Sequence, residues 1–572
     1  MGPAFIEITI IICLAALLSF VFRLFKQPAI LAYILTGILI GLLGFLNASN
    51  QEFLNTLAQL GITFLLFTLG LEIRIKNFAS ISRVVFVVAG VQMLFSFLAG
   101  YITALFFGLG IASAVYIGIT LIFSSTVIVI KLISERKEFH SLYGKIAVGV
   151  LLIQDLLAIG ILILLSGFSQ QFTTAQPIWI FAQIITKGVI LLGVVWLLGS
   201  YVFPKIMEKL AQSTETLFLA SIAWVFGLSA LVSSIGFSVE IGGFLAGLAL
   251  ANSLVNYQII ARAKILQDFF IILFFVLLGA SMTFATSFDG ILVILLPALT
   301  LSILALVVKP IIVMFIMGIM GFKKRTSFLT GISLAQISEF SLITVFLGER
   351  LGHIPSEIVS IVTLCAIITF TLSTYLVVGS KNIYKSLQRY LSFLELVTVK
   401  REDVIESSDG LSDLKNHVVL IGGDQMGQSI LESLEEMDID VVVVDFDPEI
   451  LKKLKDLSSG KTGKKSHRLY GDISDLDIQE RAKLDSAKLV ISTNPDLEDN
   501  LLILKELKHE NRRAKVVVMA FDTAEAKTLY KAGADYVVLP HLAGGRQIAK
   551  LIAENHLDKV ESLKKKDLEY IN

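Results

Sequence analysis

One acidic residue stands in the middle of an almost wholly apolar stretch. Residues 149–165 read GVLLIQDLLAIGILILL, with Gln154 and Asp155 near the centre. A carboxylate at mid-bilayer depth is costly unless it is paired, hydrated or protonated, so it marks a candidate functional site. An acid in a soluble core helix is the alternative, but apolar runs of spanning length fill the N-terminal two-thirds of the chain. We therefore predict that Asp155 carries a cation or a proton.

Two polar clusters interrupt other apolar runs. One is GITLIFSSTVIVIKL, around residues 124–126, and the other is GISLAQISEFSLIT, with Gln336, Ser338 and Glu339. Such residues can bond to the preceding helical turn or hold neighbouring helices together. Two clusters seven helices apart, in halves of opposite orientation, instead predict an inverted repeat. Paired broken helices in such a repeat point to a substrate site at the membrane midplane.

Further charged residues lie within the apolar runs. Lys309 is mid-span beside Pro310, in LALVVKPIIVMF. A buried lysine needs an anion or must lose its proton, so we expect it either to pair with Asp155 or to bond carbonyls that Pro310 leaves free. Glu339 is expected to brace the crossing of the broken helices, and Glu240 to reach water near the outer end of its helix.

The composition is that of an integral membrane protein. Hydrophobic residues make up 55% of the chain, and the formal net charge of zero implies no bulk affinity for nucleic acid. Cys13 and Cys365 lack the spacing of a disulfide or metal site. Thirteen runs meet the ~20-residue criterion for a membrane span; they cover residues 3–22, 28–46, 55–73, 84–108, 113–133, 143–166, 177–203, 214–234, 237–254, 264–285, 289–319, 323–349 and 357–379.

Basic residues are concentrated in alternate connections between these runs. Arg23 and Lys26 follow the first run, and Arg262 and Lys264 follow the ninth. Positively charged connections stay in the cytosol. The chain is therefore predicted to span the cell (inner) membrane with its N-terminus on the outer side and its C-terminal part in the cytoplasm. The first run has no basic start and no small-residue cleavage signature, so we expect a retained helix.

The periodicity changes after the last apolar run. We predict a transmembrane domain over 1–380, a linker with an interfacial amphipathic helix over 381–416, an α/β domain over 417–545 and a helical tail over 546–572. Strands alternate with helices in the α/β domain, as in a Rossmann-like fold with a parallel sheet. The predicted strands are 417–423, 440–447, 467–472, 488–493, 515–521 and 536–540.

The first turn of the α/β domain matches a nucleotide-binding fingerprint in part. Gly422, Asp424 and Gly427 take the three positions of GxGxxG, and Asp445 ends the second strand as a ribose-binding acid would. Asp424 brings bulk and negative charge where a glycine lets a pyrophosphate approach. AMP, another adenine nucleotide or no nucleotide is therefore expected in preference to NAD(H). The predicted contacts are Gly422, Gly423, Asp424, Gln425, Met426, Gly427, Asp445 and Asp472.

The two parts together resemble the Kef-type potassium–proton antiporters of the cation:proton antiporter superfamily. The matching pieces are SSTV at 124–127, the run from 135 to 155 that ends in LLIQD, GFSVEIGGFLAG, SEF at 338–340 and a C-terminal domain of the RCK or TrkA-N type. The resemblance implies a homodimer of NhaA-like protomers, each with thirteen helices and crossed broken helices beside the Gln–Asp pair. By position it implies that Asp155 binds the cation and the proton in turn, with Gln154 beside it and Ser125 and Thr126 at the first crossing.

One departure bears on regulation. Glutathione-gated members carry an acidic connection after the ninth helix, where this chain has NYQIIARAKILQD with Arg262 and Lys264. Together with Asp424, this argues against glutathione gating. The basic connection could instead receive the cytosolic domain, which would then restrain transport. The chain ends soon after the Rossmann-like domain, so a further regulatory domain is not expected.

These features predict a secondary transporter and not an enzyme. The predicted activity is exchange of K⁺ for H⁺ by an elevator-type mechanism, with Asp155 as the shared site and Gln154, Lys309 and Glu339 around it. The resemblance associates a Gln–Asp pair with potassium, while sodium stays an alternative substrate. A ligand-gated potassium channel is a second alternative, but the sequence holds no TVGYG-like filter.

Overall fold

The computed structural model divides the chain into two compact units, Met1–Thr398 and Val399–Asn572. Most of the seventh predicted span, Asp472, most of the linker and most of the tail lie outside the described residues. The structure describes residues 3–45, 51–72, 83–135, 141–167, 186, 191, 193, 195, 197, 199, 213–251, 253, 255–282, 288–320, 322, 324–387, 390–391, 414–445, 450–451, 453–454, 466–471, 473, 476–494, 496–510, 513–553 and 564.

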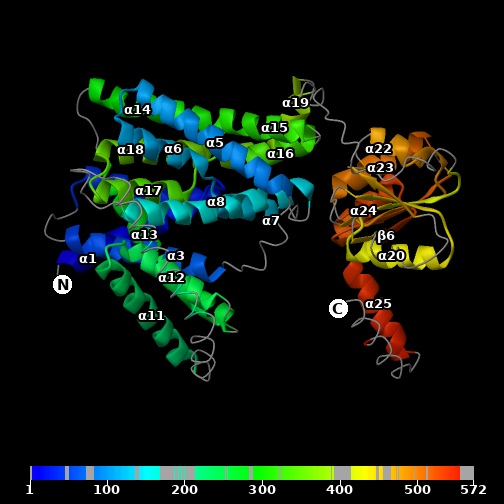
Figure 1. Cartoon of the computed structure of the whole chain (residues 1–572), viewed down its shortest axis with the longest axis horizontal. Coiled ribbons are helices and arrows are strands. Elements are labelled where there is room, and N and C mark those ends of the chain that lie inside the picture. Colours follow the sequence, from blue (N-terminus) through cyan, green and yellow to red (C-terminus); the bar gives the residue numbers. More distant parts are fainter. Residues whose placement is uncertain are drawn as a thin grey trace. The chain divides into compact units, whose positions relative to one another are not determined.

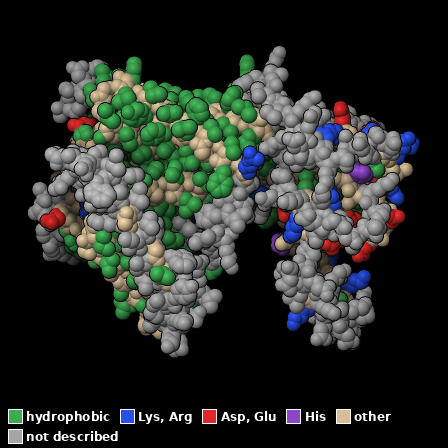
Figure 2. Space-filling view, viewed as in Figure 1, with side chains coloured by type: hydrophobic (Ala, Val, Ile, Leu, Met, Phe, Trp, Pro, Cys, Tyr) green, Lys and Arg blue, Asp and Glu red, His purple; other side chains and the backbone are tan. Residues whose placement is uncertain are grey.

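The first unit is built from apolar helices (Figure 1). In chain order they are α1 (Pro3–Leu24), α2 (Ala29–Leu42), α3 (Gln51–Glu72), α5 (Arg83–Phe106), α6 (Ile111–Ile122), α7 (Thr126–Glu135), α8 (Leu142–Gly167), α11 (Thr214–Ser234), α12 (Val239–Leu250), α13 (Asn256–Ala280), α14 (Phe288–Ile303), α15 (Lys309–Ile319), α16 (Lys324–Ser333), α17 (Glu339–Arg350), α18 (Ser356–Val378) and α19 (Ser380–Leu387). Among the described residues, nine helical stretches are long and apolar enough to cross a membrane. Figure 2 shows hydrophobic side chains gathered over α14, α15 and α5, as expected of a face that meets lipid.

Five helices pack in the order α2, α13, α3, α12 and α11. Glycines allow their backbones to touch: a Cβ on Gly243 would lie 2.6 Å from the Thr63 carbonyl oxygen, and one on Gly247 would collide with that of Phe67. The glycines of GFSVEIGGFLAG thus permit close helix packing.

The predicted start of the tenth span at residue 264 is wrong. Helix α13 already begins at Asn256, whose buried amide donates to the carbonyls of Leu71 (2.9 Å) and Ala251 (2.8 Å). Arg262 and Lys264 therefore lie on a helix and not in a connection. The hydropathy criterion missed these turns because they are amphipathic: both basic residues are exposed, whereas other positions of the same turns are buried.

The two predicted interruptions of apolar helices are confirmed. Helix α6 ends at Ile122 and α7 begins at Thr126, while α16 ends at Ser333 and α17 begins at Glu339. Serines satisfy the freed backbone groups at the second halves. Ser125 Oγ accepts from the N–H of Ile128 at 3.3 Å, and Ser338 forms a capping box with Ser341 at the start of α17.

A π-helical segment, Leu304–Val308, joins α14 to α15 immediately before Lys309 and Pro310. Proline has no N–H to give and clashes with the preceding turn, so the helix widens there. Lys309 is the first residue of α15, and only 1% of its surface is exposed. The widened turn therefore positions a buried lysine.

The second unit contains a parallel six-stranded sheet. Its strands are β1 (Val418–Ile421), β2 (Val441–Asp445), β3 (Ser466–Tyr470), β4 (Leu489–Ser492), β5 (Lys515–Met519) and β6 (Tyr536–Val538), in the spatial order β3-β2-β1-β4-β5-β6. The helices are α20 (Gln425–Glu436), α22 (Leu476–Arg481), α23 (Leu497–Glu510), α24 (Thr523–Ala532) and α25 (Pro540–Ala553). All six predicted strands and the parallel sheet are confirmed, and the strand order is that of a Rossmann-like fold.

Candidate ion site and nucleotide site

The two interrupted helices meet at their breaks. Ser124 Oγ donates to the Leu334 carbonyl at 3.1 Å, and Ser341 Oγ donates to the Thr120 carbonyl at 2.6 Å. These four residues are buried. Residues some 210–220 positions apart in the chain are thus joined through backbone carbonyls that an uninterrupted helix would keep for itself.

Asp155 lies on α8 against the first break. Thr126 Oγ1 donates to Asp155 Oδ2 at 2.9 Å, and Asp155 is only 8% exposed. Among the described residues, no cationic side chain forms an ion pair with this carboxylate, and its one hydrogen bond is that from Thr126. The structure therefore brings together a buried acid and a hydroxyl, with coordination capacity left on the acid.

Gln154 holds the first break from the same helix. Its Oε1 accepts from the N–H of Ser124 at 2.9 Å, and its Nε2 donates to Gln92 Oε1 at 2.6 Å. Gln92, on α5, in turn donates to the Ile122 carbonyl at 3.2 Å, which is the end of α6. Sequence reasoning missed Gln92, although a glutamine inside an apolar run is the same signal that singled out Gln154.

Lys309 lies where the first half-helices end. Its Nζ donates to the carbonyl oxygens of Phe123 (2.9 Å) and Gln336 (3.1 Å). These carbonyls follow α6 and α16, and the C-terminal ends of helices carry partial negative charge. The ammonium group therefore donates to one main-chain carbonyl at each break. Its partners are neither the Asp155 carboxylate nor the carbonyls that Pro310 leaves free, which were the two predicted alternatives.

Glu339 occupies the opposite ends of the breaks. Its Oε1 accepts from Ser125 Oγ at 3.0 Å, and its Oε2 accepts from Ser338 Oγ at 3.3 Å. It is the first residue of α17, and Ser125 precedes α7, so the carboxylate lies near two helix N-termini. A negative group is favourable there. The positive charge of Lys309 thus lies at helix C-terminal ends, and the negative charge of Glu339 lies at helix N-terminal ends.

Glu240 does not reach water as predicted. It is buried at 5% exposure, and its Oε1 accepts from Arg350 Nη1 at 3.0 Å. The sequence could not reveal this pair because the residues lie 110 positions apart. The pair joins the start of α12 to the end of α17.

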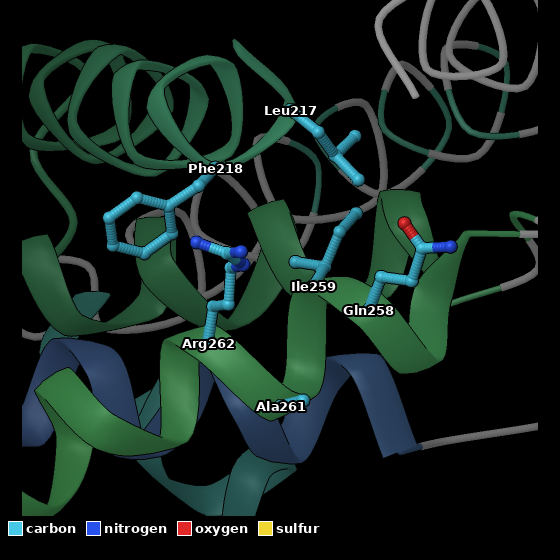
Figure 3. Close-up of a pocket in the computed structure, with 6 residues that line it drawn as sticks. All are labelled: Leu217, Phe218, Gln258, Ile259, Ala261 and Arg262. Carbon is cyan, nitrogen blue, oxygen red and sulfur yellow. The ribbon is translucent and has the colours of Figure 1, made fainter. Parts of the chain in front are cut away.

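A pocket of about 230 Å³ lies between the starts of α11 and α13 (Figure 3). Its lining includes Arg262, which extends from α13 toward the part of the pocket where Phe218 lies. None of the predicted ion-site residues lines it. This pocket is therefore separate from the site around Asp155.

The glycine-rich turn of the second unit has the conformation that its sequence requires. Gly422 has φ +92°, and a Cβ on Gly427 would collide with the Gly422 carbonyl oxygen. Gln425 and Met426 begin α20, and the exposed Asp424 is its N-cap residue. Steric constraints therefore favour glycine at the first and last positions of the fingerprint, as in a dinucleotide-binding fold.

Asp445 interacts with this turn. Its Oδ2 accepts from the Gly423 N–H at 2.6 Å, and the side chain is buried. Thr493, at the end of β4, donates to the Gly422 carbonyl at 3.1 Å. Sequence reasoning missed Thr493, which only the neighbouring position of β1 and β4 brings to the turn. The carboxylate that would bind a ribose thus also orders the loop.

The chain is therefore a multi-pass membrane protein with a second unit of Rossmann-like fold. Residues 9–378 match the family model described as "Sodium/hydrogen exchanger, transmembrane", and residues 418–540 match the TrkA-N domain. Because the first match covers more than half of the chain, the chain belongs to the sodium/hydrogen exchanger family. It is a transporter and not an enzyme, and the predicted TrkA-N domain is confirmed.

Relatives that match most of the chain are named as cation transport proteins. The putative cation/proton antiporter YbaL of Escherichia coli is 26% identical, over 95% of each chain. The glutathione-regulated potassium-efflux system protein KefC of Shigella flexneri is 26% identical, over 92% of this chain and 81% of its own length. Among solved structures, the sodium proton antiporter MjNhaP1 of Methanocaldococcus jannaschii is 18% identical, covering 65% of this chain and 98% of its own, with a TM-score of 0.47.

Proposed function

We propose that the protein exchanges K⁺ for H⁺ across the cytoplasmic membrane, with Asp155 as the shared binding site. The observation that carries the proposal is the buried Asp155 carboxylate, bonded by Thr126 at the break between α6 and α7. Family membership supports cation and proton as substrates. The potassium-efflux relatives and the adjacent Gln154 favour potassium.

The mechanism rests on competition for one carboxylate. A dehydrated cation or a proton neutralises Asp155, but not both at once. An uncompensated charge crosses the apolar barrier at high cost, so the mobile helices move only when the acid is neutralised. Exchange is thereby obligatory. Lys309 and Glu339 stay bonded to the helix ends and keep the breaks open while the occupant of Asp155 changes.

The proposed architecture has thirteen spans in two inverted halves, with the N-terminus outside and the second unit in the cytosol. The halves are related by the paired interruptions α6–α7 and α16–α17. The glycine-joined helices α2, α13, α3 and α12 form the static scaffold and the dimer side, while the interrupted helices with α5, α8, α15 and α18 form the moving core. The linker, domain and tail keep the boundaries predicted from the sequence.

The test is replacement of Asp155. Asp155→Asn should abolish cation-driven proton movement in proteoliposomes while leaving the thermal stability close to that of the wild type. Glu215→Gln, which removes an exposed acid at the start of α11, is the matched control and should transport normally. Full exchange in Asp155→Asn would rule out the assignment.

Sodium is the second candidate substrate, because the matching family is described as a sodium/hydrogen exchanger. A titration of proton flux with K⁺ and with Na⁺ in the same proteoliposomes separates the two. We expect half-maximal flux at a lower K⁺ than Na⁺ concentration. The reverse order would make the protein a sodium–proton antiporter with the same site.

We further propose that the TrkA-N domain binds an adenine mononucleotide and restrains the transporter. The support is Asp424, which carries charge and bulk where a pyrophosphate would approach the turn. Asp424→Gly restores the glycine of the fingerprint and should increase the affinity for NAD⁺ more than that for AMP. Isothermal titration of the wild type and the variant with both nucleotides measures this change; an unchanged affinity ratio would contradict the role given to Asp424.

A further inference from the structure

A second and larger pocket has none of the predicted ion-site residues in its lining. It has a volume of about 880 Å³ and is lined by the corner between α1 and α2, the first two turns of α7 and the end of α18. Three of its described lining residues are cationic, namely Arg23, Lys26 and Lys131, and none of the described lining residues is acidic. Such a pocket attracts an anion.

A buried amide adds a polar group to the cationic lining. Gln27 lines the pocket and is 8% exposed, and its Nε2 donates to the Thr371 carbonyl of α18 at 3.5 Å. Its Oε1 has no hydrogen-bond partner among the described residues. A buried acceptor without a partner is uncommon in a native structure and calls for a donor from a ligand or water.

The surroundings of the pocket are apolar and exposed. On the α1 side, Leu24 is 68% and Phe25 is 61% exposed, and on the opposite side Val127 is 63% exposed. In a membrane protein these side chains meet lipid acyl chains. The anion that fits is therefore one that carries hydrocarbon next to its charge.

We propose that this pocket binds the headgroup of an anionic phospholipid. The phosphate lies among Arg23, Lys26 and Lys131, a headgroup hydroxyl donates to Gln27 Oε1, and the acyl chains run along the exposed apolar side chains. Basic pockets between membrane helices at the cytosolic surface are suited to such headgroups. The three cations lie at helix ends or within the second turn of α7, where a headgroup would be found.

The position of the pocket gives the lipid a role in transport, and this part rests on the proposed function. Arg23 and Lys26 belong to the scaffold side, whereas Lys131 lies on α7, the half-helix that begins with Thr126. A phosphate that binds Arg23 and Lys26 on one side and Lys131 on the other connects the core to the scaffold. The lipid therefore favours the conformation seen here and slows the exchange cycle when it is bound.

Lipid binding is tested without any transport measurement. The full-length protein is reconstituted with phosphatidylglycerol and phosphatidylcholine, extracted and examined by native mass spectrometry. The triple variant Arg23→Gln/Lys26→Gln/Lys131→Gln should lose retained phosphatidylglycerol, by about five-fold for each cation removed. Arg83→Gln, which removes an exposed cation outside the pocket, is the control and should retain it. Equal retention in the triple variant and the control would overturn the proposal.

A second arm separates lipid from a soluble anion. Short-chain phosphatidylglycerol should raise the melting temperature of the detergent-solubilised wild type but not that of the triple variant, and inorganic phosphate should have no comparable effect. A phosphate effect as large as the lipid effect would assign the pocket to a soluble anion and overturn the lipid assignment.

The flux arm tests the consequence for transport. Removing phosphatidylglycerol from the liposomes should increase exchange by the wild type, whereas the triple variant should be insensitive to the lipid. If the triple variant loses the lipid but flux never responds to it, the binding site stands and its role in transport is wrong. This result is distinct from failure of the proposed exchange, which Asp155→Asn tests.

Discussion

Lys309 shows how single residues compensate the breaks in two helices. Its ammonium group bonds the carbonyls of Phe123 and Gln336, while Glu339 accepts hydroxyls at the other ends of the same breaks. Unpaired helix ends would be prohibitive in a membrane interior, where water cannot satisfy them. The site is thus a set of neutralised helix ends beside one acid, Asp155, which forms no ion pair among the described residues.

The first residue-scale prediction concerns this lysine. Lys309→Met leaves two buried carbonyls without a donor, and each such group costs about 1–3 kcal/mol. We expect a clear fall in the melting temperature measured by scanning fluorimetry in detergent. Lys324→Met, at the partly exposed start of α16, is the control and should melt close to the wild type. A Lys309→Met protein as stable as the control would show that the lysine does not hold the breaks.

At this scale the sequence identified the polar residues but not their partners. Asp155, Gln154 and the serine clusters stand out because polar residues are rare in apolar runs. Lys309 was recognised for the same reason, yet its acceptor is the carbonyl of Phe123, 186 positions away. Main-chain acceptors carry no signal in a sequence, so no residue pattern could have predicted this bond.

Among the helices, the ion pair between Glu240 and Arg350 connects the two groups that we assign to scaffold and core. It links α12, in the glycine-joined row, to the end of α17. The two partners differ in exposure: the Arg350 side chain is 47% exposed and that of Glu240 is 7% exposed. Removing Arg350 and removing Glu240 should therefore lower the free energy of unfolding by different amounts.

The pair yields an asymmetric prediction. Arg350→Gln leaves a buried carboxylate without its cation and should destabilise the protein by about 1–3 kcal/mol. Glu240→Gln leaves only an exposed guanidinium and should cost less than about 1 kcal/mol. Chemical unfolding of the two variants in detergent measures the difference. Equal losses would contradict the predicted difference between the buried carboxylate and the exposed guanidinium.

Helix boundaries were predictable only where hydropathy and structure coincide. The interruptions at Ser124 and Gln336 followed from polar clusters, and the six strands followed from short apolar runs between helices. The start of α13 was missed because its first turns bury one face and expose Arg262 and Lys264 on another. A criterion that averages hydropathy over a window cannot detect such a face.

On the scale of the whole molecule, the chain joins a membrane transporter to a TrkA-N domain with its own hydrophobic cores. The change of periodicity after residue 380 predicted this division. The packing order of the membrane helices was not predictable, because every apolar run satisfies the same lipid-facing criterion and spacing does not reveal which helices touch.

The division leads to a prediction about regulation. If the TrkA-N domain restrains the core, removal of the residues from about 400 onward should raise the basal exchange rate in proteoliposomes. Protein amount and monodispersity in detergent control for folding. Unchanged or lower flux in a well-folded truncation would contradict restraint by this domain.

The glycine contacts between α2, α13, α3 and α12 have one more consequence. A Cβ on Gly37 would collide with the Val276 carbonyl, and one on Gly70 with that of Phe244, so main chains touch with no flexible side chain between them. A layer built this way cannot bend by repacking rotamers. Two spectroscopic labels placed on this layer should keep a constant separation through every turnover. They would serve as a fixed reference for measuring whether Asp155 is displaced during exchange.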